Sequence, residues 1–269
     1  MIDILKKITD QTRLDLEKRK QLKSLSELRT MPHYARSPLC LSAALNNGSG
    51  IIAEHKRQSP SKGTFGCEAT LSEVVTGYEK AGVSAISCLT DEPFFGGTLE
   101  DLLHAREVVN IPLLRKDFMI DLYQVHEAKA YGADAILLIA ACLDNEELKT
   151  LSAEAINIGL SILYEVHDLE ELERIKSVSK HFNPTNFVIG VNNRDLKVFK
   201  TDIQNSKDLL PHFPENVVAV SESGISDPTV VQELQKSGFT GFLIGEHFMK
   251  TNDPGMACVN FIKTVQDAD

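Results

Sequence analysis

The stretch Ile51-Ile52-Ala53-Glu54-His55-Lys56-Arg57-Gln58-Ser59-Pro60-Ser61-Lys62-Gly63 has the pattern of a buried strand that ends in charged residues and a turn. Two β-branched residues favour an extended start, and the Ser-Pro-Ser-Lys-Gly run is rich in turn formers. Because side chains alternate along a strand, Glu54 and Lys56 share one face and His55 points to the other. Such a pair at a strand end is typical of a functional site, although a solvent-exposed pair on an edge strand has the same spacing.

Seven further apolar runs follow, at intervals that leave room for a helix between them. The predicted strands are 51–57, 85–90, 112–118, 135–140, 161–167, 187–193, 217–224 and 241–246. In three connections a glycine able to take the left-handed helix C-cap conformation precedes the next apolar run, at Gly82, Gly132 and Gly238. Apolar runs without alternation are typical of parallel sheets covered on both faces. The repetition predicts a (β/α)8 TIM barrel over residues 49–269 rather than an open doubly wound sheet.

Residues 1–48 have a different pattern, charged and helical, with an apolar stripe that includes Ile4, Leu5 and Ile8. We expect an N-terminal helical extension that packs on the barrel, so that the chain forms one domain in all. The first predicted strand is followed by no Gly-x-Gly-x-x-Gly and no Walker loop, which counts against a dinucleotide-binding or nucleotide-hydrolysing fold.

Charge and composition narrow the class of partner. The chain of 269 residues is 42% hydrophobic, with a net charge of -10 and no sustained run of Lys and Arg. This argues against nucleic acid or an anionic membrane as the partner, and it requires a site for an anionic ligand to gather positive charge locally. The five cysteines are far apart, which suggests neither a disulfide framework nor a zinc site. Without a signal peptide or a membrane-spanning run, we expect a soluble, cytoplasmic protein, and we expect a monomer.

In a (β/α)8 barrel the functional groups lie where the strands run into the loops at their carboxyl ends. The predicted strands carry polar residues near these points: Glu54, Lys56, Lys116, Glu165, Asn192, Arg194 and Glu222. Each alone has a structural explanation, and Lys116 beside Asp117 fits an exposed ion pair. Together they indicate a site, because charges inside a barrel mouth cost free energy unless they are paired or used.

Two glycine-containing segments, Ser221-Glu-Ser-Gly-Ile and Ile244-Gly245-Glu246, stand after the seventh and eighth runs, where barrels often bind a phosphate through backbone N–H groups. Together with Lys56 and Ser59 they predict a phosphorylated substrate. Apolar residues near the polar ones, Phe95, Phe118, Leu137 and Leu196, would suit a ring-shaped part of it, although each is also an ordinary core or loop anchor. The histidines show no metal-ligand spacing, and His167, near Glu165, is the one close to the predicted site.

Seven segments in order resemble indole-3-glycerol-phosphate synthase, a tryptophan-pathway barrel family. They are Glu54-His-Lys-Arg-Gln-Ser-Pro-Ser-Lys-Gly, Leu89-Thr-Asp-Glu-Pro-Phe-Phe-Gly-Gly, Leu114-Arg-Lys-Asp-Phe-Met-Ile-Asp, Tyr164-Glu-Val-His, Gly190-Val-Asn-Asn-Arg-Asp-Leu, Ser221-Glu-Ser-Gly-Ile and Ile244-Gly-Glu. The resemblance implies a carboxy-lyase that converts 1-(2-carboxyphenylamino)-1-deoxyribulose 5-phosphate to indole-3-glycerol phosphate with loss of carbon dioxide and water. It implies no cofactor and no metal.

The same resemblance implies roles for single residues. Lys116 is similar to the family's general acid, and Glu165 to its partner in proton transfer during dehydration. Glu54 and Lys56 are similar to the pair that assists these steps and holds the carboxylate and phosphate ends of the substrate. The remaining implied roles are hydroxyl orientation by Asn192 and Glu222, anthranilate positioning by Arg194, a phosphate cradle of Lys56, Ser59, Ser223, Gly224, Gly245 and Glu246, and a ring pocket of Phe95, Phe118, Leu137 and Leu196.

Other functions fit parts of the pattern. A different phosphosugar barrel is one alternative, either phosphoribosylanthranilate isomerase or a Schiff-base aldolase with Lys116 as nucleophile. A non-catalytic barrel that binds phosphorylated metabolites is another. The complete set of acid and base residues weighs against the non-catalytic alternative.

Overall fold

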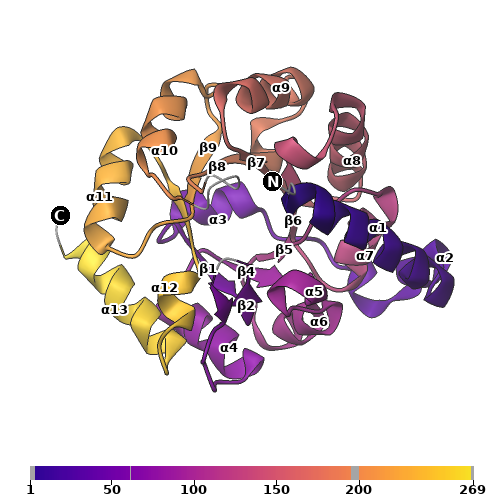
Figure 1. Cartoon of the computed structure of the whole chain (residues 1–269), viewed down its shortest axis with the longest axis horizontal. Coiled ribbons are helices and arrows are strands. Elements are labelled where there is room, and N and C mark those ends of the chain that lie inside the picture. The colour runs from indigo at the N-terminus through magenta and orange to yellow at the C-terminus, as the bar shows by residue number, and fades with distance from the viewer. Residues whose placement is uncertain (1–3, 61, 195–199, 268–269) are drawn as a thin grey trace.

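Parallel strands that close into a barrel form the centre of the fold (Figure 1). The structure, a computed structural model, describes residues 4–60, 62–194 and 200–267. Within this part of the chain the closed barrel has eight strands: β1 (Ile51–His55), β4 (Ala85–Leu89), β5 (Leu113–Lys116), β6 (Ala135–Ile139), β7 (Ser161–Val166), β8 (Phe187–Asn192), β9 (Val218–Glu222) and β10 (Gly241–Ile244). β1 pairs with both β4 and β10. The predicted TIM barrel is confirmed, and each strand ends one or two residues earlier than predicted.

Helices surround the strands and connect them, as Figure 1 shows. They are α4 (Leu71–Ala81), α5 (Glu92–Phe95), α6 (Leu99–Val108), α7 (Leu122–Ala130), α8 (Asn145–Asn157), α9 (Leu169–Ser179), α10 (Gln204–Leu209), α11 (Pro228–Ser237), α12 (Glu246–Met249) and α13 (Pro254–Gln266), with short 3-10 turns η2 (Ala140–Cys142), η3 (Pro184–Asn186) and η4 (Leu210–His212). Gly82 and Gly238 cap α4 and α11 in the left-handed conformation, as their sequence context predicted. A short hairpin of β2 (Gln58–Ser59) and β3 (Gly63–Thr64) follows β1. In the described residues, every helix is too short or too polar to cross a membrane.

The N-terminal segment covers both ends of the barrel. It comprises α1 (Ile4–Leu22), α2 (Leu25–Thr30), η1 (Pro32–Ala35) and α3 (Leu41–Asn47). The start of α1 lies over the mouth formed by the strand carboxyl ends, whereas α3 lies behind the barrel in Figure 1. Ser42 of α3 donates a hydrogen bond to the carbonyl of Thr185, just before β8, which places α3 at the amino ends of the strands.

The apolar core has an inner and an outer part. The inner cluster fills the barrel and includes Ile52, Leu114 and Leu163, together with Ile8 from α1 and Leu45 from α3. The outer cluster packs the strands against the surrounding helices. Side chains from both ends of the N-terminal segment therefore complete the interior of the barrel.

A buried ion network interrupts this apolar packing behind β5. Arg115 is fully buried and donates hydrogen bonds to Asp117 at 2.8 Å and to Glu127 of α7 at 2.9 Å. Arg19 of α1 forms an ion pair with the second oxygen of Glu127, at 3.1 Å. Thr90 donates a hydrogen bond to Asp117 as well. The network connects α1 and α7 to the strand that carries Lys116.

Candidate active site

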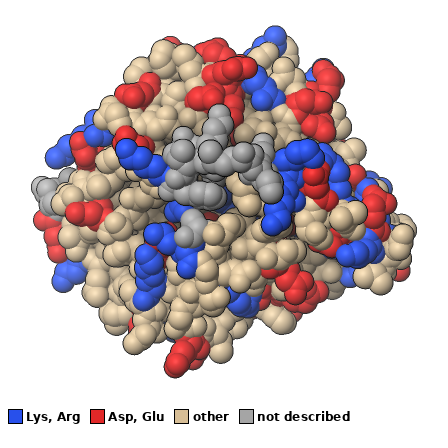
Figure 2. Space-filling view, viewed as in Figure 1, with Lys and Arg blue, Asp and Glu red and all other residues tan. Residues whose placement is uncertain are grey.

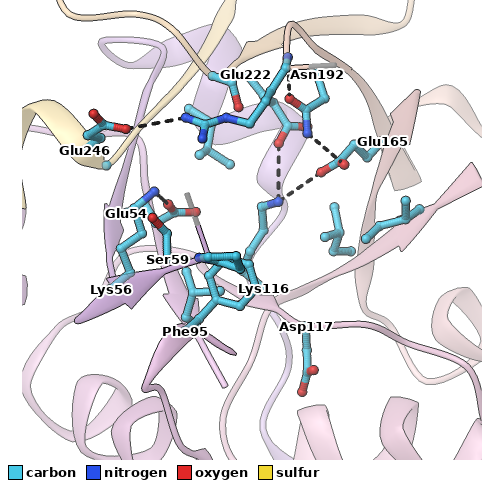
Figure 3. Close-up of a pocket in the computed structure, with 18 of the residues that line it drawn as sticks. Glu54, Lys56, Ser59, Phe95, Lys116, Asp117, Glu165, Asn192, Glu222 and Glu246 are labelled. Atoms are coloured by element: carbon cyan, nitrogen blue, oxygen red, sulfur yellow. Dashed lines mark hydrogen bonds and ion pairs between the residues drawn. The ribbon is translucent and has the colours of Figure 1, made fainter. Parts of the chain in front are cut away.

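A pocket opens at the carboxyl ends of the strands (Figure 3), and residues at the start of α1 also line it. Fifteen of the residues predicted for the site line it: Glu54, Lys56, Ser59, Phe95, Lys116, Phe118, Leu137, Glu165, Asn192, Arg194, Glu222, Ser223, Gly224, Gly245 and Glu246. The remaining predicted residue, Leu196, lies outside the described residues. The pocket thus collects side chains that come from most of the strands and are far apart in the sequence.

Lys116, at the end of β5, is the central cation of the pocket. Its Nζ donates a hydrogen bond to Glu165 Oε2 at 2.9 Å and lies 3.6 Å from Glu222 Oε2 (Figure 3). Burial alone would lower the pKa of the Lys116 ammonium, but the charges of Glu165, Glu222 and Glu54 outweigh burial and raise it above its usual value. Lys116 is therefore held as an ammonium that can donate a proton.

The two carboxylates that share Lys116 have opposite pKa shifts. Burial would raise the pKa of Glu165, but Lys116, His167 and a hydrogen bond from Asn192 at 3.0 Å lower it to about 2. Glu222 is almost fully buried, and no described residue donates a hydrogen bond to its Oε1. Burial and the negative charge of Glu165 therefore raise the pKa of Glu222 to about 8. Such a separation provides one ionised and one protonated carboxyl group near neutral pH, the arrangement that acid–base chemistry uses.

A second lysine–carboxylate pair lies across the pocket, at the end of β1. Lys56 Nζ donates to Glu54 Oε1 at 2.7 Å, so the side chains that strand alternation placed on one face do meet. Burial opposes ionisation of Glu54, yet Lys56 and Lys116 together lower its pKa. Gly245 is required for this arrangement, since a Cβ at that position would stand 2.7 Å from Glu54 Oε1. The Glu54–Lys56 pair is thus mostly buried and lies inside the pocket, which excludes the alternative of a solvent-exposed pair.

The predicted phosphate region lies between the loop after β9 and the start of α12. Ser223 and Gly224 both have positive φ, 68° and 79°, which makes a tight turn of the kind whose backbone N–H groups bind anions. Glu246 is the first residue of α12 rather than the end of a strand as predicted. Its carboxylate accepts a hydrogen bond from Lys250 at 2.6 Å and lies 3.4 Å from Arg194. Because that carboxylate has the same charge sign as a phosphate, the backbone N–H of Glu246 is the group suited to bind one.

Positive charge in the pocket is present but already paired. Among the described lining residues, the cations are Lys56, Lys116 and Arg194, and the acids are Glu54, Asp117, Glu165, Glu222 and Glu246. Figure 2 shows the same mixture on the surrounding face, with Lys and Arg around the centre and Asp and Glu among them. The expected local gathering of cations is therefore balanced by carboxylates. An anionic substrate must compete with these internal partners.

Apolar side chains form the remaining wall. The rings of Phe95 and Phe118 lie with their centroids 6.2 Å apart, next to Leu137. Three residues of α1 also line the pocket: Ile4, Leu5 and Ile8. Their spacing in the sequence indicated an apolar stripe, but it contained no information about which part of the barrel the stripe would cover.

Two polar residues near the pocket, Asp117 and His167, have no role predicted from the sequence. Asp117 lines the pocket, yet its carboxylate points away from Lys116 in Figure 3 and accepts hydrogen bonds from Thr90 and Arg115. His167 lies behind Glu165, with Nε2 3.5 Å from Glu165 Oε1. The described residues include no group of three or more His, Cys, Asp or Glu side chains placed to hold a metal ion.

Acid and base groups arranged around a buried ammonium, at the carboxyl ends of barrel strands, define an acid–base enzyme of the (β/α)8 class. Comparison with known proteins gives the family. The model of the indole-3-glycerol phosphate synthase family matches residues 5–261. The chain belongs to that family.

Individual relatives agree with this assignment. An indole-3-glycerol phosphate synthase of Bacteroides thetaiotaomicron is 47% identical over 267 residues, which cover 99% of this chain and 100% of the relative. One from Salinibacter ruber is 44% identical and covers 95% of this chain and 94% of its own. The crystal structure of 3-hexulose-6-phosphate synthase from Salmonella typhimurium has a TM-score of 0.61 at 12% identity, over 82% of this chain and 100% of that one. At this identity the likeness concerns the fold alone.

Proposed function

We propose that this chain converts 1-(2-carboxyphenylamino)-1-deoxyribulose 5-phosphate to indole-3-glycerol phosphate, with Lys116 as the general acid. The family assignment supports the reaction. The observation that supports the role of Lys116 is its position as an ammonium between Glu165 and Glu222 at the centre of the pocket. The reaction proceeds by ring closure, loss of carbon dioxide and loss of water. The enzyme must therefore both donate protons to the substrate and accept protons from it.

Ring closure is the step that requires a general acid. Attack by the aromatic carbon on the ribulose carbonyl breaks aromaticity, so the carbonyl must be made more electrophilic. Donation of a proton from Lys116 Nζ to the carbonyl oxygen has this effect, typically worth about 10²–10⁴-fold in rate. Carbon dioxide then leaves, and its bonding electrons restore the aromatic ring.

Dehydration requires a proton on the departing hydroxyl and a base for a second proton. Glu165, ionised beside Lys116, is suited to be the base or to return protons to Lys116. The Glu54–Lys56 pair assists these transfers. Asn192 and Glu222 orient the substrate hydroxyls, since the two residues are paired at the ends of β8 and β9 and both line the pocket.

Binding follows from the same geometry. Lys56, Ser59, Ser223, Gly224, Gly245 and Glu246 form the phosphate cradle. Arg194 positions the anthranilate part, and the ring lies against Phe95, Phe118 and Leu137, with Leu196 assigned to the same wall. We also propose that the protein works as a cytoplasmic monomer without a cofactor, with residues 1–48 as an extension on a barrel of residues 49–269.

The reaction is tested by following indole fluorescence after the purified protein is mixed with the carboxyphenylamino-deoxyribulose phosphate in excess EDTA. Fluorescence that develops in the presence of the chelator, and that Lys116→Ala abolishes, is the expected result. A folded protein that binds the substrate without any fluorescence change would overturn the proposal and favour the isomerase or the binding-protein alternative.

A Schiff-base aldolase requires a neutral Lys116 amine, which the surrounding carboxylates disfavour. Borohydride trapping distinguishes the two mechanisms. A covalent substrate adduct on Lys116 after reduction would support the aldolase, and its absence during active turnover would support the acid role.

A further inference from the structure

His167 lies directly after β7, and its ring stands between two carboxylates. Its Nδ1 is 3.2 Å from Glu171 Oε2, and its Nε2 is 3.5 Å from Glu165 Oε1. The backbone N–H of His167 donates to the same Glu171 oxygen at 2.7 Å. The side chain is mostly buried, with 17% of its surface exposed. Glu171, in the first turn of α9, therefore holds both the backbone and the ring of His167.

This environment determines where the ring carries its protons. A carboxylate oxygen accepts hydrogen bonds, so the proton on the side of Glu171 belongs to Nδ1. Nε2 is buried and has no hydrogen-bond partner among the described residues. A lone pair on Nε2 would face the negative Glu165 Oε1, whereas a proton there makes the same contact attractive.

The charged groups around the ring act in the same direction. These groups are the carboxyl groups of Glu165 on β7, Glu171 on α9 and Glu222 on β9. Asn205 of α10 is neutral and donates a hydrogen bond to the His167 carbonyl rather than to the ring. Burial alone would lower the pKa of the imidazole, but the hydrogen bond with Glu171 and the carboxylate charges outweigh burial and raise it. The imidazolium form is thus favoured in the folded protein.

We infer that His167 is a positioning residue for Glu165, acting as an imidazolium bridge between Glu171 and the carboxylate in the pocket. The inference rests on the proposed role of Glu165. With His167 and Asn192 on Oε1, the second oxygen, Oε2, is left to Lys116. The arrangement fixes which oxygen of Glu165 exchanges protons with the lysine.

The bridge matters most after Lys116 has given its proton to the substrate. Lys116 is then a neutral amine, and the ionised Glu165 has lost its closest counterion. Among the described residues, the His167 imidazolium is the cationic group that remains beside Glu165. It keeps Glu165 ionised, so that Glu165 remains available as a base in the next step.

The test uses His167→Gln, which keeps similar reach without charge, and Glu171→Gln, which removes the anchor of the ring without touching Glu165. We expect each to lower kcat by about 10-fold, less than the about 10²–10⁴-fold of a group that transfers the proton itself, while KM changes by less than about 2-fold. The double variant should be no slower than His167→Gln alone, because both changes act through one bridge. Glu170→Gln, an exposed neighbour in the same helical turn, is the matched control and should behave as the unmodified protein.

NMR of the imidazole nitrogens measures the protonation state and the pKa of His167 directly, which tests the bridge independently of activity. The expected spectrum has Nδ1 protonated and a pKa above 6.5 that falls in both Glu165→Gln and Glu171→Gln. Unchanged kcat in folded His167→Gln, or multiplicative effects in the double variant, would overturn the inference. Glu165→Gln in the same assay separates the two proposals: if it is fully active, the role of Glu165 fails, and if it alone is inactive, only the bridge fails.

Discussion

The Glu222 carboxylate occupies the space that a side chain at position 190 would need. Residue 190 is a glycine on β8, and a Cβ built there would overlap Glu222 Oε1 and stand 3.0 Å from the side chain of Leu163. The glycine on one strand thus sets the position of a buried acid on the next.

Gly190→Ala is therefore expected to displace Glu222 and to lower kcat by at least about 10-fold, since Glu222 lies 3.6 Å from Lys116. Steady-state kinetics with a check of folding by circular dichroism measures this. Gly66→Ala is the control, because nothing lies within 4 Å of its added Cβ. Normal turnover in Gly190→Ala would show that Glu222 need not occupy its observed position.

Lys116→Arg separates charge from acidity. An arginine keeps a positive charge between Glu165 and Glu222 but does not release a proton at accessible pH. We expect the variant to fold with a Tm near that of the unmodified protein and to lose activity by about 10²–10⁴-fold, as Lys116→Ala should. Calorimetry measures the Tm, and the fluorescence assay measures the loss of activity. Substantial activity in Lys116→Arg would mean that Lys116 acts through its charge alone.

The pH dependence of stability should reflect Glu222. The folded chain raises the pKa of this group to about 8, whereas a glutamate in the unfolded chain titrates near about 4.3. Between these values the folded state binds a proton that the unfolded state has released, so the free energy of unfolding falls as pH rises through this window. Glu222→Gln should remove at least about 1 kcal/mol of that fall, about 2–4 °C in the Tm difference between pH 5.5 and 8.5.

The exposed Glu215→Gln, in the loop before β9, is the control for this titration and should leave the fall in Tm unchanged. An alkaline limb near pH 8 in the kcat profile is expected from the same group and should vanish in Glu222→Gln. Identical pH profiles of Tm for Glu222→Gln and the unmodified protein would contradict the assignment of the shifted group.

Arg115→Met should destabilise the fold. It removes the partner of two buried carboxylates, so that Asp117 loses its ion pair and Glu127 keeps Arg19 alone. Breaking a buried ion pair from one side costs about 3–5 kcal/mol, which denaturant unfolding would measure. Arg13→Met removes an exposed pair with Asp10 and should cost less than about 1 kcal/mol. Equal costs would show that the network contributes no more than a surface pair.

The strands were predictable because their apolar runs are continuous, which follows from burial on both faces. The polar residues of the pocket were predictable for a related reason: charged side chains at strand ends inside a barrel cost free energy unless they are paired or take part in function. The Arg115 network was not predicted, since it depends on helix α7 and on Arg19, far away in the sequence. The close contact between Gly190 and the Glu222 carboxylate was not predictable either, because it depends on the pairing of β8 with β9.

The order in which the chain leaves the ribosome conflicts with the order in which the barrel closes. β1 emerges early, but one of its edges pairs with β10. Ile51 therefore has no partner on that edge until Phe242 has been synthesised. Until then the growing sheet has two free edges, whose unpaired backbone N–H and C=O groups can pair with another chain. Contacts of such long sequence separation slow folding. We therefore expect nascent chains that stop before β10 to depend on chaperones and to aggregate without them. Once β10 is available, it pairs with β1 and the barrel closes.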